Sequence, residues 1–248
     1  MNKLLKAMLN PIVARFTEHD HRLESLELGF DHLLHGKKYE PSKKRAFNGQ
    51  EQRKLIFAEL LNFFEFDVII ETGTRSGNTT AYMRETSGLP VITCELDKIL
   101  HQVAQKRLED FDNITFVRGD SRKFLSGLFR DNPSFSEAFI YLDAHWYDDL
   151  PLAEELRIIS SNFEGRAVIM VDDFRVPGDE GYGYDDYGRK KTLDMKTFSK
   201  VFEENGLEAF FPAVASSEEN GAVRGCIVLL NRDDASRLSD SAHLRSMN

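Results

Sequence analysis

The sequence predicts a doubly wound, mostly parallel α/β fold, and two observations lead to this prediction. Five short segments are almost continuously apolar and rich in β-branched residues, as strands buried on both faces of a parallel sheet are: residues 66–70, 91–94, 114–117, 138–142 and 167–171. About twenty residues separate each segment from the next, which is enough for a right-handed helical crossover and too long for a hairpin.

The elements before and after these five strands divide the chain into three parts. Residues 1–46 are polar with apolar positions on one helix face, and we expect an N-terminal helical cap. Residues 47–232 form the main domain. It begins with an amphipathic helix after Gln50 and ends with two strands, 209–214 and 226–230, whose short polar connection favours an antiparallel pair. Residues 233–248 are expected to form a loose polar tail.

Composition excludes several classes of function. The 248 residues carry a formal net charge of -9, which argues against binding to nucleic acid. No run of about 18 apolar residues is present, so we expect no membrane span and a cytoplasmic protein. Cys94 and Cys226 lie in apolar segments without further ligands nearby and are predicted to be buried, reduced thiols. The N-terminal helices are the expected contact of a homo-oligomer.

The loop after the first predicted strand has the pattern of a cofactor site. Ligands of open α/β sheets bind outside the carboxyl ends of the strands. Here the chain places Glu71, Gly73, Thr74 and Gly77, and a helix then opens with Asn78-Thr79. The spacing matches neither the P-loop nor the dinucleotide fingerprint. An acid at the strand tip repels a pyrophosphate but accepts hydrogen bonds from an ammonium group, so the loop favours a cationic nucleoside.

The next two strand ends carry residues suited to the rest of a nucleoside. Glu95 follows the second strand, and a carboxylate in this place accepts the hydroxyls of a ribose. Asp120 and Ser121 follow the third strand and offer an acceptor and a hydroxyl to an adenine edge. Acids at strand ends also cap helices, but their order at three successive strand ends favours a binding site.

These motifs resemble those of the class I S-adenosylmethionine-dependent methyltransferases over about residues 47–230. The resemblance implies a seven-stranded Rossmann-like sheet with an antiparallel last strand. It also implies that Glu71 and the glycine loop hold the methionine part of S-adenosyl-L-methionine, Glu95 the ribose, and Asp120 with Ser121 the adenine. Asp143 is expected at the border of the same site.

The fourth and fifth predicted strands end in acids. Asp143 follows the fourth strand, and Asp172-Asp173 follow the fifth. Neighbouring strands lie about 4.8 Å apart, so these carboxylates converge, and their repulsion favours a hard divalent cation such as Mg²⁺. The alternative is that the acids cap helices or accept hydrogen bonds from backbone amides.

This acidic pattern is similar to that of the metal-dependent O-methyltransferases of the catechol and macrocin types. The resemblance implies that Asp143, Asp172 and Asp173 hold the metal ion and that the acceptor is a hydroxyl group of a small molecule: a sugar, a phenol or a natural product. Asp143 and His145 remain alternatives for the general base. Residues 177–188 are expected to form a mobile lid whose Tyr182, Tyr184 and Tyr187 stack on an acceptor ring.

Other functions remain open on the same fold, because a fold does not fix a reaction. One alternative is an NAD-dependent oxidoreductase, and another is a metal-dependent hydroxylase or hydrolase. A third is a binding module without catalysis. Titration with S-adenosylmethionine and with NAD would distinguish these alternatives.

Overall fold

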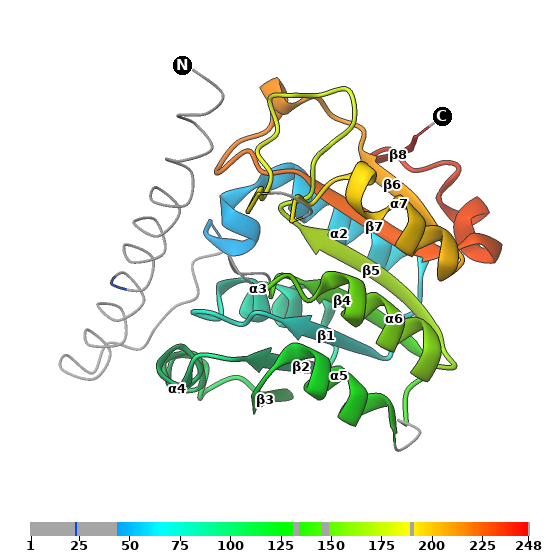
Figure 1. The fold of residues 1–248 in the computed structure, drawn as a ribbon. Coiled ribbons are helices and arrows are strands. Elements are labelled where there is room, and N and C mark those ends of the chain that lie inside the picture. Colours follow the sequence, from blue (N-terminus) through cyan, green and yellow to red (C-terminus); the bar gives the residue numbers. More distant parts are fainter. Residues whose placement is uncertain (1–22, 24–43, 131–133, 145–148, 189–190, 248) are drawn as a thin grey trace.

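A computed structural model describes residues 23, 44–130, 134–144, 149–188 and 191–247. It contains an eight-stranded sheet with the order β3-β2-β1-β4-β5-β7-β6-β8 (Figure 1). The strands are β1 (Val68–Thr72), β2 (Val91–Glu95), β3 (Ile114–Arg118), β4 (Glu137–Leu142), β5 (Arg166–Asp172), β6 (Leu207–Pro212), β7 (Cys226–Asn231) and β8 (Leu244–Ser246).

Strands β1 to β5 are parallel, and the direction of winding reverses between β1 and β4. The chain runs from β1 outward to β2 and β3, and then returns to place β4 on the other side of β1. Such a switch point is where open α/β sheets bind ligands. The predicted doubly wound, mostly parallel fold is therefore confirmed, and so is the antiparallel pairing of β6 with β7.

Helices cover both faces of this sheet (Figure 1). They are α2 (Glu51–Phe63), α3 (Asn78–Ser87), α4 (Lys98–Arg107), α5 (Ser121–Arg130), α6 (Leu152–Asn162) and α7 (Met195–Glu204), with short 3-10 helices η1 (Ala46–Gly49), η2 (Ser216–Glu218) and η3 (Arg232–Leu238).

Two apolar cores, one on each face, hold the layers together. Ile70 of β1 faces a core with residues of α5, α6 and α7, whereas Ile69 faces a core with residues of α2 and α3. Successive side chains of a strand point to opposite faces, so a continuous apolar run feeds both cores.

The first strand lies two residues further along the chain than the sequence predicts. β1 runs from Val68 to Thr72, so Glu71 belongs to the strand and not to the loop after it. Its register with β4, which pairs Thr72 with Leu142, extends the ladder past the end of the apolar run. A polar residue can continue a strand wherever a neighbouring strand offers hydrogen bonds, and sequence pattern does not reveal this.

The prediction of a loose tail and of only seven strands is wrong. After β7 the chain forms η3 and then β8, which pairs antiparallel with β6 at the edge of the sheet. Leu238 and Leu244 are buried, 2% and 4% exposed, and the Glu59 carboxylate accepts a hydrogen bond of 2.7 Å from the Ala242 amide. Two isolated leucines in a polar stretch give no periodic signal, so this docking follows from tertiary burial alone.

Three further predictions concern the cysteines, the membrane and the N-terminal cap. Cys94 and Cys226 are both buried and free, as predicted. Among the described residues, none of the helices is long and apolar enough to cross a membrane. The N-terminal cap lies almost entirely outside the described residues, so its helices and its role in a homo-oligomer stay predictions.

Candidate functional site

The loop after β1 packs directly on the end of β4. Gly73 has φ +88, and a Cβ atom there would lie 2.3 Å from the carbonyl oxygen of Asp143. The Asp143 amide in turn donates a hydrogen bond of 3.0 Å to the Thr72 carbonyl. A residue with a side chain would force these two strand ends apart, so glycine is required here by the fold itself.

Glu71 is buried at the end of β1, with 1% of its surface exposed. Its Oε2 accepts hydrogen bonds of 2.6 Å from the hydroxyls of Thr80 and Thr93. Burial raises the pKa of Glu71 to about 7 despite these two bonds. Within the described residues Oε1 has no donor, so this carboxylate retains the capacity to accept a further hydrogen bond.

One pocket joins the ends of β1, β2 and β3. The residues predicted to hold a nucleoside at these ends share it: Gly73, Glu95, Asp120 and Ser121 all line its wall. Further lining residues are Cys94, Leu96, Gly119, Ala144, Asp149 and Pro151. Leu96 is 65% exposed and gives the pocket an apolar wall that sequence reasoning missed.

Nearby groups hold the two acids of this pocket that the sequence predicts, Glu95 and Asp120. The Glu95 carboxylate accepts hydrogen bonds from the amides of Arg75, at 2.7 Å, and Asp97, at 2.9 Å. Burial nevertheless raises the pKa of Glu95. Asp120 forms an ion pair with Arg122, which also contacts Asp149 at 2.7 Å, and the hydrogen bond from Arg122 lowers the pKa of Asp120.

The other predicted loop residues shape the loop and are not part of the pocket wall. Thr74 shares a hydrogen bond with Thr93, and Asn78 donates one of 3.1 Å to the Ser76 hydroxyl. Thr79 accepts a hydrogen bond of 3.1 Å from the Phe47 amide. Gly77 is in the left-handed region, with φ +77, where a Cβ would lie 2.7 Å from Leu108 Cδ1.

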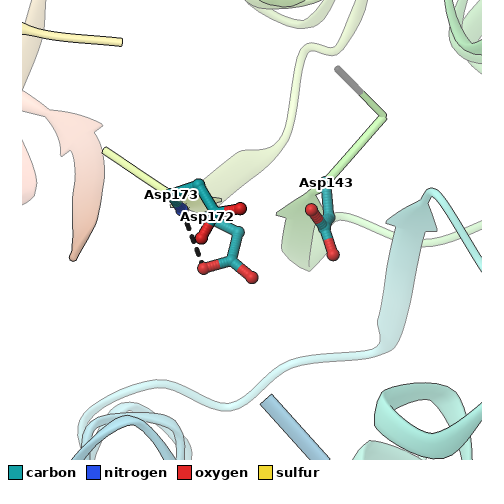
Figure 2. A group of neighbouring side chains, drawn as sticks. All are labelled: Asp143, Asp172 and Asp173. Atoms are coloured by element: carbon teal, nitrogen blue, oxygen red, sulfur yellow. Dashed lines mark hydrogen bonds between the residues drawn. The ribbon is translucent and has the colours of Figure 1, made fainter. Parts of the chain in front are cut away.

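The acids at the ends of β4 and β5 converge as the sequence predicts. Asp143, Asp172 and Asp173 each offer an oxygen, and these oxygens all lie within 4.8 Å of one another (Figure 2). Burial, together with the charges of Asp173 and Asp185, raises the pKa of Asp143 well above its usual range. Asp173 has φ 54, an uncommon conformation for a residue other than glycine. Strained backbone of this kind concentrates at functional sites.

Asp172 is fully buried and surrounded by donors. Its Oδ1 forms an ion pair with Arg53 of α2 and accepts a hydrogen bond of 2.8 Å from the Asp173 amide. Its Oδ2 accepts hydrogen bonds from the Tyr141 hydroxyl, at 2.7 Å, and from the side-chain amide of Asn48, at 3.3 Å. Both oxygens therefore have two partners, of which Asn48 is the most distant.

Asp173 belongs to a second ion pair, which introduces a fourth acid. The Arg224 guanidinium contacts Asp173 Oδ1 at 2.7 Å and also pairs with Asp185. The Tyr187 hydroxyl donates to the other oxygen of Asp185. Sequence reasoning missed Arg53, Arg224 and Asp185. For Arg53 a signal existed, since a charged residue on the inner face of an apolar helix needs a buried partner.

Residues 177–188, which the sequence predicts to form a mobile lid, are hydrogen-bonded to the segments that follow β5 and precede β7. The Gly183 amide donates 2.9 Å to the Val223 carbonyl, and the Asp185 amide donates 2.9 Å to the Asp173 carbonyl. Tyr182 is 2% exposed and donates to the Val214 carbonyl at 3.0 Å, so it cannot stack on an acceptor. Tyr184 stacks on the Arg175 guanidinium, 5.2 Å from the ring centre.

The chain was compared with protein-family models, curated proteins and solved structures. No protein-family model matches the chain, and no curated protein does. Solved structures match it over most of its length. An O-methyltransferase from Bacillus cereus, determined in complex with SAH, is 16% identical, with 89% of this chain and 97% of that chain covered at a TM-score of 0.54.

Two further structures share the same arrangement. The SAH-bound methyltransferase PaMTH1 of Podospora anserina is 13% identical, covering 89% of this chain and 95% of its own at a TM-score of 0.53. A SAM-dependent methyltransferase from Aquifex aeolicus is 14% identical, covering 78% and 98% at a TM-score of 0.51. The chain has the class I methyltransferase fold.

In this methyltransferase fold the pocket and the acidic cluster occupy adjacent strand ends. Gly73 belongs to the pocket wall and touches the backbone of Asp143, which belongs to the acidic cluster. His145, the alternative general base, lies outside the described residues and stays a prediction.

Proposed function

We propose that the protein is an S-adenosylmethionine-dependent O-methyltransferase that acts on a hydroxyl group of a small molecule. The enzyme uses a divalent cation, and Mg²⁺ is the first candidate. The contact of Gly73 with the Asp143 backbone supports this best. Through this contact the pocket and the acidic cluster are neighbours, as a methyl donor and the hydroxyl that accepts the methyl group have to be.

The pocket fits S-adenosylmethionine, which supplies a methyl group on a positively charged sulfur. The donor-free oxygen of the buried Glu71 suits the ammonium of the methionine part. We assign the ribose hydroxyls to Glu95 and the adenine edge to Asp120 with Ser121, and the support is that all three line the same pocket. Thr74, Gly77, Asn78 and Thr79 contribute by holding the loop in shape.

The acidic cluster fits a divalent cation. Asp143, Asp172 and Asp173 each offer a carboxylate oxygen, and such an all-oxygen set suits a hard divalent cation. Oxygens bound to one Mg²⁺ lie at most about 4.2 Å apart, so the three carboxylates need only a small shift to share an ion. The distant Asn48 amide is the donor that a cation at Asp172 would replace.

The residues of the chain would then perform three tasks. Asp143 and Asp173 orient the acceptor next to the pocket, which supplies catalysis by proximity. A cation held there would lower the pKa of a neighbouring hydroxyl. Asp143 and His145 are the alternatives for the proton acceptor, since both follow β4 in the sequence and Asp143 belongs to the acidic cluster.

Asp143→Asn tests the proposal. The variant keeps the shape of the side chain but loses its charge, and we expect the rate of methyl transfer to fall at least about 100-fold. Affinity for S-adenosylmethionine, measured by calorimetry, should change by less than about threefold, because the pocket wall is formed by other side chains.

Glu164→Gln is the matched control, because Glu164 is exposed at the amino end of β5, opposite the site. Undiminished turnover of Asp143→Asn, or equal turnover with and without a chelator, would exclude the cation. Binding of NAD in place of S-adenosylmethionine would exclude the methyltransferase activity altogether. Cofactor binding without transfer to any tested hydroxyl would favour the binding module.

A further inference from the structure

Arg53 occupies a position that the proposed chemistry does not explain. Its side chain is 1% exposed, so it cannot bind a ligand at the surface. A fully buried guanidinium is costly unless every part of it is paired. Arg53 pairs with Asp172 Oδ1 and donates to the carbonyls of Arg224 and Gly225, the latter at 2.9 Å, while its Nε has no hydrogen-bond partner within the described residues.

These contacts connect Arg53 to both ion pairs of the acidic cluster. It fixes one oxygen of Asp172 directly. It also fixes the backbone of Arg224, whose side chain contacts Asp173 and Asp185. A single residue of α2 thus sets the position of the acids at the end of β5 and keeps Asp185 bound to Arg224.

The contact with Oδ1 has a chemical consequence for any cation. Oδ1 is held by Arg53 and by the Asp173 backbone amide at 2.8 Å, whereas the weakest donor to Oδ2 is the Asn48 side chain at 3.3 Å. An ion that replaces Asn48 therefore binds Asp172 through Oδ2 alone. Ca²⁺ takes six to eight oxygens and often binds a carboxylate through both of them. Mg²⁺ needs few protein oxygens in a strict geometry and keeps several waters.

We infer that Arg53 is a positioning residue that makes the acidic cluster selective for small divalent cations, by restricting Asp172 to a single coordinating oxygen. The inference rests on the proposed function, since it concerns the cation of that site. Lysine keeps the charge of Arg53 but is a point donor without the planar fork, so it cannot hold Asp172 and two carbonyls together.

The experiment compares wild type with Arg53→Lys, using Mn²⁺ as the probe and measuring how well Mg²⁺ and Ca²⁺ displace it. In the wild type we expect Mg²⁺ to displace Mn²⁺ at least about tenfold better than Ca²⁺. In Arg53→Lys this ratio should fall about tenfold, through stronger binding of Ca²⁺. Affinity for S-adenosylmethionine should stay within about threefold.

Arg166→Lys is the matched control. Arg166 also forms ion pairs, with Glu137 at 2.7 Å and Asp234 at 3.0 Å, but it lies at the start of β5, at the opposite end of the strand. Its variant should keep the wild-type ratio. If Arg53→Lys does not fold, Arg53→Gln is the second variant, because it also removes the guanidinium from Asp172 Oδ1. A change in the same direction is expected.

The outcomes separate the inference from the proposed function. A folded Arg53→Lys or Arg53→Gln with the wild-type ratio would overturn the inference and leave the cation site standing. A wild type that prefers Ca²⁺ would do the same. Failure of the wild type to bind Mn²⁺ at all would overturn both the inference and the cation of the proposed function, while methyl transfer in chelator would still report on the cofactor pocket.

Discussion

The pocket at β1 to β3 and the acidic cluster at β4 and β5 are neighbours on one sheet edge, yet they are built differently. In the pocket, acids are held by groups within 20 residues: Glu95 by the amides of Asp97 and Arg75, two and 20 residues away, and Asp120 by Arg122, two residues away. In the acidic cluster, Asp172 and Asn48 are 124 residues apart, and Asp173 and Arg224 are 51 apart. The pocket is therefore organised locally, and the cluster depends on the complete fold.

The largest effect should come from removing a charge in the cluster. Asp172→Asn leaves Arg53 buried without its counter-ion, and breaking a buried pair in this way costs about 3–5 kcal/mol of unfolding free energy. Urea denaturation measures it. Asp120→Asn is the matched change in the pocket, and it should cost less than about 1 kcal/mol because Arg122 is partly exposed. Equal costs would contradict the difference between the two regions.

An acid next to the pocket is buried as deeply as Asp172 but forms no ion pair with an arginine among the described contacts. Glu155 of α6 is 0% exposed, and burial raises its pKa to about 7. Because its folded pKa is above its unfolded value near 4.5, it favours folding at low pH. That stability should be lost as the pH rises from about 4.5 to 7, by about 3 kcal/mol in all.

Glu155→Gln tests this by denaturation at pH 5.5 and pH 8. The difference between wild type and variant should grow with pH in favour of glutamine. A variant whose stability follows the wild type at both pH values would mean that Glu155 is ionised in the fold.

The two regions are joined at Gly73, so a side chain there should disturb both. Gly73→Ala places a methyl group against the Asp143 carbonyl at a positive φ, and we expect a loss of about 2 kcal/mol. Gly127→Ala in α5 has open space around it and should be neutral or slightly stabilising. Thermal unfolding of both variants, with cofactor titration, checks the prediction. A Gly73→Ala protein as stable as wild type would show that the strand ends can separate freely.

The smallest effect should be confined to the pocket. Glu95→Gln keeps the shape of the side chain but weakens its hydrogen bonds to the amides of Arg75 and Asp97 and to a ribose. Affinity for S-adenosylmethionine should fall about tenfold, which corresponds to about 1.4 kcal/mol. Mn²⁺ affinity should not change. A parallel loss of both affinities would show that the pocket and the cluster act as one site.

Sequence reasoning succeeded where local rules apply and failed where distant residues meet. Apolar runs separated by crossover lengths predict the parallel sheet, and acids at successive strand ends predict both the pocket and the cluster. The edge strand β8 was missed because it depends on two buried leucines in a polar tail. Tyr182 was assigned to a lid although it belongs to the core, because burial of a single aromatic residue leaves no pattern.

The sequence by itself determined the fold class and the position of the acids, because the parallel strands and their carboxyl ends follow from periodicity and connection length. Only the tertiary structure decided which charges neutralise them. Arg53 on α2 and Arg224 before β7 reach the end of β5 from opposite parts of the chain. Pairing over such distances is set by how the layers pack, and packing is a property of the whole fold.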